Sequence, residues 1–322
     1  MLRMNARAAD IARRMVEDSE ALGINVITLS NGTTLIDAGV NMPGSLKAGR
    51  LFAEACLGGL GQVSFSRSEY NDPASGSSFW LPSVSVSVSQ PHLACMASQY
   101  AGWAINGEKF FAMGSGPARA LYAGEELFKK LEFQEQAEVA VLLLEGRKLP
   151  GEDVAATVAG KCGIPTQALT LLIAPTASIV GSVQIAARIV ETGLHKMIEL
   201  GFDVRQVSSG YGLCPIATIA SDDLRAIGRT NDAVLYGGQA FYTVRTSDEV
   251  LAGLVEKVPS SASRDYGTPF YEIFQRYGGD FYKIDPMLFS PAQVSFNNLA
   301  SGHVFTAGRV NPALLYTSLL RG

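Results

Sequence analysis

The amino-acid sequence predicts an α/β protein built from mixed α+β layers of helices and strands. Two apolar runs, 138–144 and 169–173, have the length and composition of buried strands, and a helical segment over about 151–161 lies between them. This order is typical of strands joined by a crossover helix. Hydrophobic residues make up 47% of the 322 residues and charged residues 17%, which favours a large buried core over a disordered chain.

The N-terminal segment is predicted to form a helix, a hairpin and a second helix. Apolar residues at helical spacing precede Gly23, a residue typical of a helix end. Asn31-Gly32 lies between two β-rich runs, which indicates a tight hairpin turn. The expected elements are helix 4–22, strands 25–29 and 33–38, and helix 46–57.

The next segment is predicted to contain two strands separated by a loop. We expect a strand over 62–66 and an exposed loop over 67–78, because the latter is rich in Ser, Asn, Asp, Pro and Gly. Valines alternate with serines over 81–89, which predicts a strand with one covered face.

The remainder of the chain mixes helices and strands without an internal repeat or a recognisable linker. A long helix is expected over 178–200, ended by Gly201. The whole chain, 1–322, is expected to be a single unit, with two lobes whose boundary the composition does not mark. The other expected elements are helices 221–228, 247–257 and 267–276 and strands 232–236, 239–245, 292–297 and 303–307.

Composition argues against several classes of protein. The chain has 26 basic and 30 acidic residues and a formal charge of −4, so no basic excess favours binding to nucleic acid. Its longest apolar runs have about six residues, whereas a membrane-spanning helix needs about 20. The four cysteines and three histidines lack the spacing of a disulfide framework or a metal site. We therefore expect a cytoplasmic protein that acts without a metal.

The first candidate site is the small-residue segment 111–120. Gly114, Ser115 and Gly116 are predicted to form a turn whose backbone N–H groups bind an anion such as a phosphate or carboxylate. Arg119 would add a charge-assisted contact. The segment is neither a GxxxxGK[ST] nor a complete GxGxxG motif, and an ordinary structural turn remains an alternative.

The second candidate site follows the predicted strand 169–173. Ligands of α/β proteins bind beyond the carboxyl ends of strands, which is where Pro175, Thr176 and Ser178 lie. Thr176 or Ser178 is equally suited to cap the next helix, and capping is compatible with binding.

The third candidate site lies in the predicted helix 178–200. Residues three apart share a helix face, so Arg188 and Glu191 can meet, either as a surface salt bridge or as a partly buried polar pair. His195 is expected at the helix end, where the negative end of the dipole favours it, rather than in catalysis.

Taken together, these segments resemble the methenyltetrahydromethanopterin cyclohydrolase family over nearly the whole chain. The total length agrees, and the main departures lie in 64–78. Many ordered blocks at family-like spacing are more specific than any single motif. The blocks are 37–45 (DAGVNMPGS), 48–52 (AGRLF), 56–61 (CLGGLG), 111–119 (FAMGSGPAR), 174–178 (APTAS), 188–196 (RIVETGLHK), 230–234 (TNDAV), 259–263 (PSSAS) and 281–286 (FYKIDP).

The resemblance implies an enzyme that interconverts the 5,10-methenyl cation of tetrahydromethanopterin and its 5-formyl derivative by adding or losing water. It also implies a cytoplasmic α/β homotrimer, with a pocket between two lobes of one catalytic unit and no metal or redox cofactor. The family's catalytic arginine and glutamate fall on Arg188 and Glu191. The pterin carrier would then be the substrate, and neither nucleic acid nor a membrane would be a partner.

On this interpretation Glu191 activates water and Arg188 orients Glu191 or the hydroxylated intermediate. Pro175, Thr176 and Ser178 are expected beside the polar edge of the pterin ring. Gly114, Ser115, Gly116 and Arg119 are expected to bind an anionic group of the carrier's tail.

Two other interpretations are open. The chain could be a non-catalytic pterin-binding subunit of a one-carbon enzyme assembly, although a passive binder has no need of Glu191 as a general base. It could also be a nucleotide-dependent enzyme that uses 114–119 as a phosphate loop. That segment lacks a following Lys-Ser or Lys-Thr, and the chain lacks an obvious pair of magnesium carboxylates.

Overall fold

A computed structural model describes residues 3–72, 76–280 and 283–321 of the chain. The structure divides into two compact units, Met1–Gln62 with His92–Gln184, and Val63–Pro91 with Ile185–Gly322. The chain enters each unit twice, so no single point in the sequence separates them. Part of the predicted loop 67–78, residues 73–75, and the start of the matched block 281–286, residues 281–282, lie outside the described residues.

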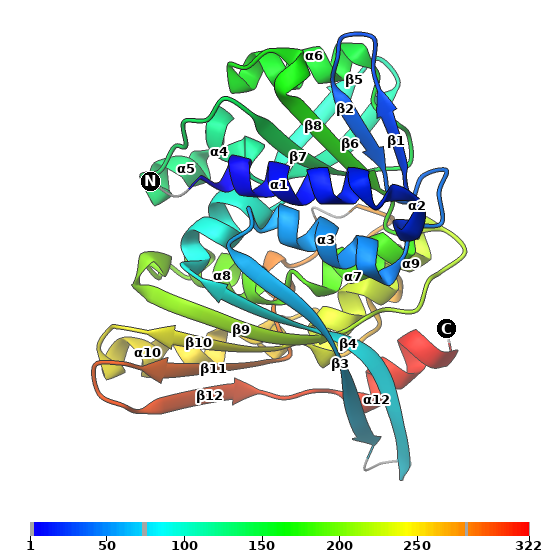
Figure 1. Cartoon of the computed structure of the whole chain (residues 1–322). Coiled ribbons are helices and arrows are strands. Elements are labelled where there is room, and N and C mark those ends of the chain that lie inside the picture. Colours follow the sequence, from blue (N-terminus) through cyan, green and yellow to red (C-terminus); the bar gives the residue numbers. More distant parts are fainter. Residues whose placement is uncertain (1–2, 73–75, 281–282, 322) are drawn as a thin grey trace. The chain divides into compact units, whose positions relative to one another are not determined.

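The first unit is built on a six-stranded sheet with the order β1-β2-β8-β7-β6-β5 (Figure 1). Its three central strands, β2, β8 and β7, are parallel, and the outer pairs are antiparallel. The carboxyl ends of the parallel strands therefore share one edge, where Asp37 pairs with Ile173 and Glu145 with Ala174. The strands are β1 (Asn25–Thr28), β2 (Thr34–Asp37), β5 (Trp103–Gly107), β6 (Phe110–Ser115), β7 (Ala140–Glu145) and β8 (Leu169–Ala174).

Alternate residues of β7 point to two hydrophobic cores, because successive side chains of a strand face opposite sides of the sheet. Val141 and Leu143 pack in the core with α1 (Met4–Glu17) and α3 (Leu46–Cys56). Leu142 and Leu144 pack in the core with α4 (Ala118–Tyr122) and α6 (Glu152–Cys162). Helices thus cover both faces of the sheet, as expected for buried parallel strands (Figure 1).

Local signals in the sequence predict most of this unit correctly. The predicted hairpin is the antiparallel pair β1–β2. The predicted helix 4–22 is α1 followed by the short α2 (Ser19–Leu22), and Gly23 ends it in the left-handed region with φ 65°. The Ser45 hydroxyl caps α3 by accepting a hydrogen bond from the Ala48 N–H. The unit also contains η1 (His92–Gln99), α5 (Glu126–Leu131) and the start of α7 (Ile179–Ala186).

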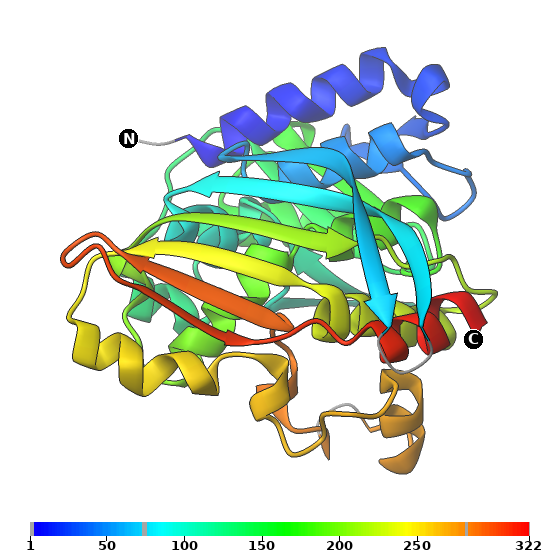
Figure 2. The same ribbon diagram turned by 90° about the horizontal axis from the view of Figure 1, so that it is seen from below.

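The second unit has a six-stranded sheet with the order β12-β11-β10-β9-β4-β3, and Figure 2 shows its strands face on. Of the pairings β4–β9, β9–β10, β10–β11 and β11–β12, only β10–β11 is parallel. Tyr211 and Phe241 are opposite each other on neighbouring strands and are exposed. The strands are β3 (Gly61–Asp72), β4 (Ser77–Ser89), β9 (Val207–Pro215), β10 (Gln239–Val244), β11 (Gln293–Asn298) and β12 (Val304–Gly308).

The described helices of the second unit follow several predicted segments. Helices 221–228 and 247–257 are confirmed, with the side chains of Asp222 and Ser247 as caps, and 267–276 is confirmed in its second part. The helices are α8 (Ile189–Glu199), α9 (Asp223–Asp232), α10 (Asp248–Leu254), α11 (Phe270–Arg276) and α12 (Pro312–Tyr316), with the π-helical turns η4 (Ala233–Gly237) and η9 (Thr317–Arg321).

Three predictions of secondary structure are wrong. The described parts of the predicted loop 67–78 include the ends of the long strands β3 and β4. The apolar run 232–236 continues α9 into η4 instead of forming a strand, since a short apolar run does not distinguish helix from strand. The predicted helix 178–200 is interrupted at 187–188, which divides it into α7 and α8. Strands β5, β6 and β9 have no counterpart among the predicted elements.

Candidate active site

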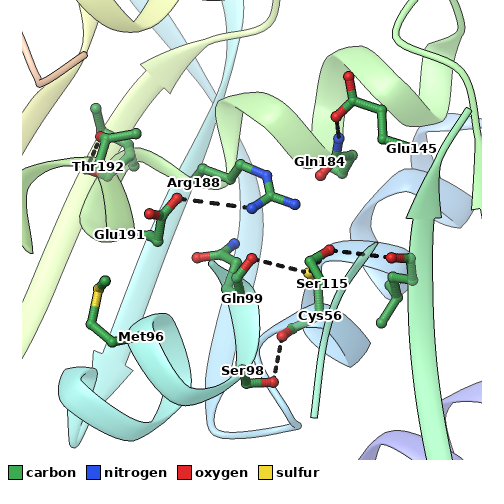
Figure 3. Close-up of polar contacts among 12 residues, drawn as sticks. Cys56, Met96, Ser98, Gln99, Ser115, Glu145, Gln184, Arg188, Glu191 and Thr192 are labelled. Atoms are coloured by element: carbon green, nitrogen blue, oxygen red, sulfur yellow. Dashed lines mark hydrogen bonds and ion pairs between the residues drawn. The ribbon is translucent and has the colours of Figure 1, made fainter. Parts of the chain in front are cut away.

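The interruption between α7 and α8 places Arg188 at the start of a helix. Arg188 occupies the N-cap position of α8 (φ −81°, ψ 4°), and Glu191 lies in the first turn. The Arg188 Nη1 and Glu191 Oε2 atoms are 3.8 Å apart, and the two side chains are only 10% and 7% exposed (Figure 3). The predicted encounter of these residues is confirmed, and it occurs in the interior rather than on the surface.

Two sources of positive charge act on the Glu191 carboxylate. The N-terminal end of a helix carries a partial positive charge, which stabilises an anion in the first turn. The Arg188 guanidinium adds a full charge at ion-pair distance in a buried environment. Because 3.8 Å exceeds the length of a direct hydrogen bond, the contact between Arg188 Nη1 and Glu191 Oε2 is an electrostatic one and not part of a bidentate hydrogen-bonded pair. The arrangement places a carboxylate, a side chain suited to act as a general base, beside a cation in the interior.

Glycines of the second sheet position the first turn of α8 closely against its strands. A Cβ atom at Gly210 would lie 2.5 Å from Val190 Cγ1, and one at Gly212 would lie 2.4 Å from Ile189 Cγ2. Both distances are too short for real Cβ contacts, so β9 needs glycine at these two positions. The segment that contains these two glycines was not predicted to be a strand, since glycine weakens the alternating pattern that indicates one.

A buried tyrosine fixes this turn from the neighbouring strand. Tyr242 in β10 donates a hydrogen bond from its hydroxyl to the Val190 carbonyl at 2.9 Å. The hydroxyl occupies the space a side chain at Gly193 would need, because a Cβ there would lie 2.1 Å from it. Tyr242 therefore connects β10 to the turn that carries Glu191.

We expect Tyr242→Phe to lower the free energy of unfolding by about 1 kcal/mol and to reduce kcat less than tenfold, because the ring stays and one hydrogen bond is lost. Denaturant unfolding and steady-state kinetics measure the two effects. Tyr211→Phe is the matched control, since Tyr211 is 50% exposed, and it should change neither. Equal losses in the two variants would show that the contact to Val190 has no special role.

The later turns of α8 carry two further basic side chains. His195 Nε2 lies 3.9 Å from Glu199 Oε1, a partly exposed pair one turn apart near the helix end, in keeping with the expected helix-end position. Lys196 is buried and donates a hydrogen bond to the Met287 carbonyl. Burial lowers the pKa of the Lys196 ammonium to about 8, against the opposing effect of the Asp285 carboxylate. These contacts anchor the second half of the helix.

The segment after β8 forms a compact turn in the first unit. Ser178 donates a hydrogen bond from its hydroxyl to the Pro175 carbonyl at 2.7 Å and accepts one from the Gly181 N–H at 2.9 Å, so it has the capping role that was one of the two expectations. A Cβ atom at Gly39 would lie 2.9 Å from Ser178 Oγ, which brings the loop after β2 close to this turn. Asp37 holds that loop by accepting hydrogen bonds from three successive backbone N–H groups.

Thr176 contacts Glu145, a residue that was not among the candidates predicted from the sequence. Its hydroxyl donates a hydrogen bond to Glu145 Oε1 at 2.5 Å. Gln184 Nε2 donates to the other carboxylate oxygen of Glu145 at 3.3 Å (Figure 3). Glu145 ends the apolar run of β7, so the one available signal was a carboxylate at the carboxyl end of a buried strand.

The segment predicted to form an anion-binding turn is mostly strand. Gly114 and Ser115 belong to β6, where Gly114 pairs with Leu144 and Ser115 with Leu143. The Ser115 hydroxyl accepts a hydrogen bond from Cys56 Sγ at 3.2 Å (Figure 3). Gly116 has φ 98°, and its N–H donates to the Ser98 carbonyl at 2.8 Å. The predicted turn over 114–115 is therefore wrong, and the Gly116 N–H already has a protein partner.

Arg119 is fully buried and held by protein groups. Its Nε and Nη2 atoms donate to the two oxygens of Glu125 at 2.8 and 2.6 Å. Nη1 donates to the Met96 and Ser98 carbonyls at 3.1 and 3.0 Å. Its binding to an anionic tail stays a prediction, but these contacts favour a structural role, because a ligand would have to replace partners that Arg119 already has.

The residues that the structure describes hold neither a cluster of metal ligands nor a membrane-spanning helix. No group of three or more His, Cys, Asp or Glu side chains among them is placed to hold a metal ion. None of the helices in the part of the chain that the structure describes is long and apolar enough to cross a membrane.

Comparison with known proteins identifies the family. The family described as Cyclohydrolase (MCH) matches residues 3–319. The chain is 47% identical over 322 residues to methenyltetrahydromethanopterin cyclohydrolase of Methanocaldococcus jannaschii, covering 99% of this chain and 98% of the relative. It is 45% identical to the protein of that name from Methanothermobacter marburgensis, covering 99% of both chains. A third protein of that name, from Methylobacillus flagellatus, is 45% identical over 314 residues, covering 97% of this chain and 94% of the relative. The chain therefore belongs to the Cyclohydrolase (MCH) family.

Proposed function

We propose that this protein is an enzyme that interconverts 5,10-methenyltetrahydromethanopterin, with water, and 5-formyltetrahydromethanopterin. The names of relatives that match almost end to end support this activity. The buried Arg188–Glu191 pair carries the proposal structurally, because it offers an anionic base beside a cationic partner at the start of a helix.

The substrate is an amidinium-like cation whose positive charge is spread over two nitrogens and the bridging carbon. That carbon is already electrophilic, so the reaction needs a deprotonated nucleophile in position. A water molecule must lose a proton as it attacks, and the tetrahedral intermediate must then break one C–N bond. A carboxylate suits the first step as a general base, and its charge favours the cation nearby.

We assign the general base to Glu191 and a positioning role to Arg188. The guanidinium lies at ion-pair distance from the carboxylate and would orient it or the hydroxylated intermediate. Arg188 must act from the side of Glu191 that faces away from the bridging carbon, since two positive charges in contact would repel each other. Protonated Glu191 then returns its proton to the nitrogen that leaves. As that C–N bond breaks, the hydroxyl oxygen of the intermediate forms the formyl carbonyl, and its proton passes through Glu191 to solvent, so that one proton is released overall.

The remaining assignments are parts of the same proposal. Pro175, Thr176 and Ser178 would border the pterin, and Gly114, Ser115 and Gly116 would lie towards the anionic tail. The carrier is the substrate, and no other cofactor, metal, nucleic acid or membrane partner is proposed. The protein would act in the cytoplasm as a homotrimer, as the family resemblance implies.

The non-catalytic pterin-binding subunit has no observation in its favour, because a passive binder needs no buried base beside an arginine.

The decisive experiment is a hydrolysis assay of the purified protein with the methenyl carrier, in which the loss of the carrier's absorbance is followed. We expect turnover well above the spontaneous rate. Binding of the carrier without any acceleration would overturn the proposed reaction.

A further inference from the structure

Glu145 stands out in the first unit because its carboxylate faces neutral partners only. One oxygen accepts from Thr176 Oγ1 at 2.5 Å and the other from Gln184 Nε2 at 3.3 Å. Within the part of the chain that the structure describes, Glu145 forms no ion pair. Each carboxylate oxygen has two lone pairs, so each retains the capacity to accept a further hydrogen bond.

The position of Glu145 is typical of a ligand-binding residue in an α/β sheet. Residues 140–144 of β7 are buried, and the strand leaves the core at Glu145, which is partly exposed. Glu145 pairs with Ala174 at the carboxyl edge of the parallel strands, where such sheets bind their ligands. The adjacent turn of Pro175–Ser178 is the segment that the sequence analysis associated with the edge of the pterin.

The two neutral donors hold the carboxylate in one orientation without neutralising it. Thr176 and Gln184 lie on the segment that follows β8, so they fix Glu145 from the neighbouring strand. A carboxylate oriented in this way is suited to a ligand with two parallel N–H donors, because both oxygens can accept at once. The pyrimidine ring of a pterin has these donors in its 2-amino group and its N3–H.

We propose that Glu145 binds the 2-amino and N3–H edge of the pterin ring through both carboxylate oxygens. This assignment rests on the proposed function, since it names the part of that substrate which Glu145 would recognise. It makes Glu145 a specificity residue rather than a catalytic one. Thr176 then contributes by positioning Glu145, which gives the predicted binding residue a defined task.

The test exploits the reversed polarity of an amide. In Glu145→Gln the carboxamide still accepts one hydrogen bond but presents N–H to the pterin's second donor, where the two groups repel. We expect the KM for the methenyl carrier to rise about 10-fold to 100-fold, with kcat within about threefold of wild type. Glu138→Gln, an exposed change in the same unit, is the control and should leave both constants unchanged.

A second readout separates recognition from a merely structural effect. A 2,4-dioxo analogue, 6-methyltetrahydrolumazine, replaces the 2-amino donor of 6-methyltetrahydropterin with an acceptor. The wild type should be inhibited at least tenfold more strongly by the pterin than by the lumazine, and Glu145→Gln should narrow or reverse this preference. Equal inhibition of the wild type by both compounds, or by neither, would overturn the assignment, as would an unchanged preference in the variant.

Failure of this inference is distinguishable from failure of the proposed function. If the wild type hydrolyses the methenyl carrier but the Glu145→Gln variant keeps the same KM and the same preference, the reaction stands and Glu145 has no part in recognition. A wild type that does not hydrolyse the carrier would contradict the function itself.

Discussion

Glu191→Gln is expected to fold normally, to bind the carrier with an affinity within a few-fold of wild type, and to lose 10²–10⁴-fold in kcat. The amide has nearly the size and shape of the carboxylate, so packing in the first turn of α8 is preserved. It cannot take a proton from water at neutral pH, so the attack of water on the bridging carbon loses its general base. Steady-state hydrolysis of the methenyl carrier measures the loss, and thermal unfolding tests the fold.

Glu199→Gln provides a matched control on the same helix. Glu199 is the last residue of α8, and its side chain is 44% exposed, so the same chemical change there should leave kcat unaltered. A Glu191→Gln variant that retained near-normal kcat would remove Glu191 from the mechanism. A loss of kcat together with a large fall in the unfolding temperature would instead assign Glu191 a structural role.

Arg119→Met is expected to destabilise the protein by about 3–5 kcal/mol, the range typical of breaking a buried ion pair by removing one partner. The change leaves the Glu125 carboxylate, whose side chain is only 15% exposed, without its cation. It also removes the donor shared by the Met96 and Ser98 carbonyls. The guanidinium further lies 5.3 Å from the ring centroids of Tyr100 and Phe128, so packing is lost as well. Denaturant unfolding measures the difference.

Two comparisons make this result interpretable. Arg13→Met removes an exposed pair with Asp10, with both side chains more than 60% exposed, and should change stability by no more than about 0.5 kcal/mol. The double variant Arg119→Met, Glu125→Met should recover part of the stability that Arg119→Met loses, because the unpaired carboxylate is then gone. An Arg119→Met variant of normal stability with a raised KM would instead favour the predicted contact with the carrier's anionic tail.

The parts of the fold that sequence patterns predicted correctly are those fixed by local chemistry. The buried strands β7 and β8 follow from continuous apolar runs, and the hairpin β1–β2 follows from the Asn31-Gly32 turn. The predicted α/β class follows from the order of these elements.

Elements specified by their neighbours were missed. Strand β9 carries Gly210 and Gly212, which weaken a strand pattern but are required where Val190 and Ile189 pack against the sheet. The interruption before α8 was not predicted because no proline or glycine marks it: positions 186–189 are Ala, Ala, Arg and Ile. Tertiary packing overrides local propensity at these places.

The contacts of the candidate site likewise divide into one that local spacing predicts and others that depend on tertiary packing. The pairing of Arg188 with Glu191 follows from a spacing of three residues and was predictable. The contact between Thr176 and Glu145 depends on the register of β7 against β8, and the burial of Arg119 depends on Glu125 and on two carbonyls of η1. Neither can be inferred from one segment alone, which is why Glu145 was missed and Arg119 was expected at the ligand.

The most direct test of the proposed mechanism is a crystal structure of Glu191→Gln with the methenyl carrier bound. We expect the side chain of residue 191 to lie about 3 Å from a water molecule, with that water facing the bridging carbon of the carrier. Arg188 should contact residue 191 or the water and stay away from the carbon. A structure in which residue 191 points away from the carrier, with no water between the two, would contradict the assignment of Glu191 as the general base.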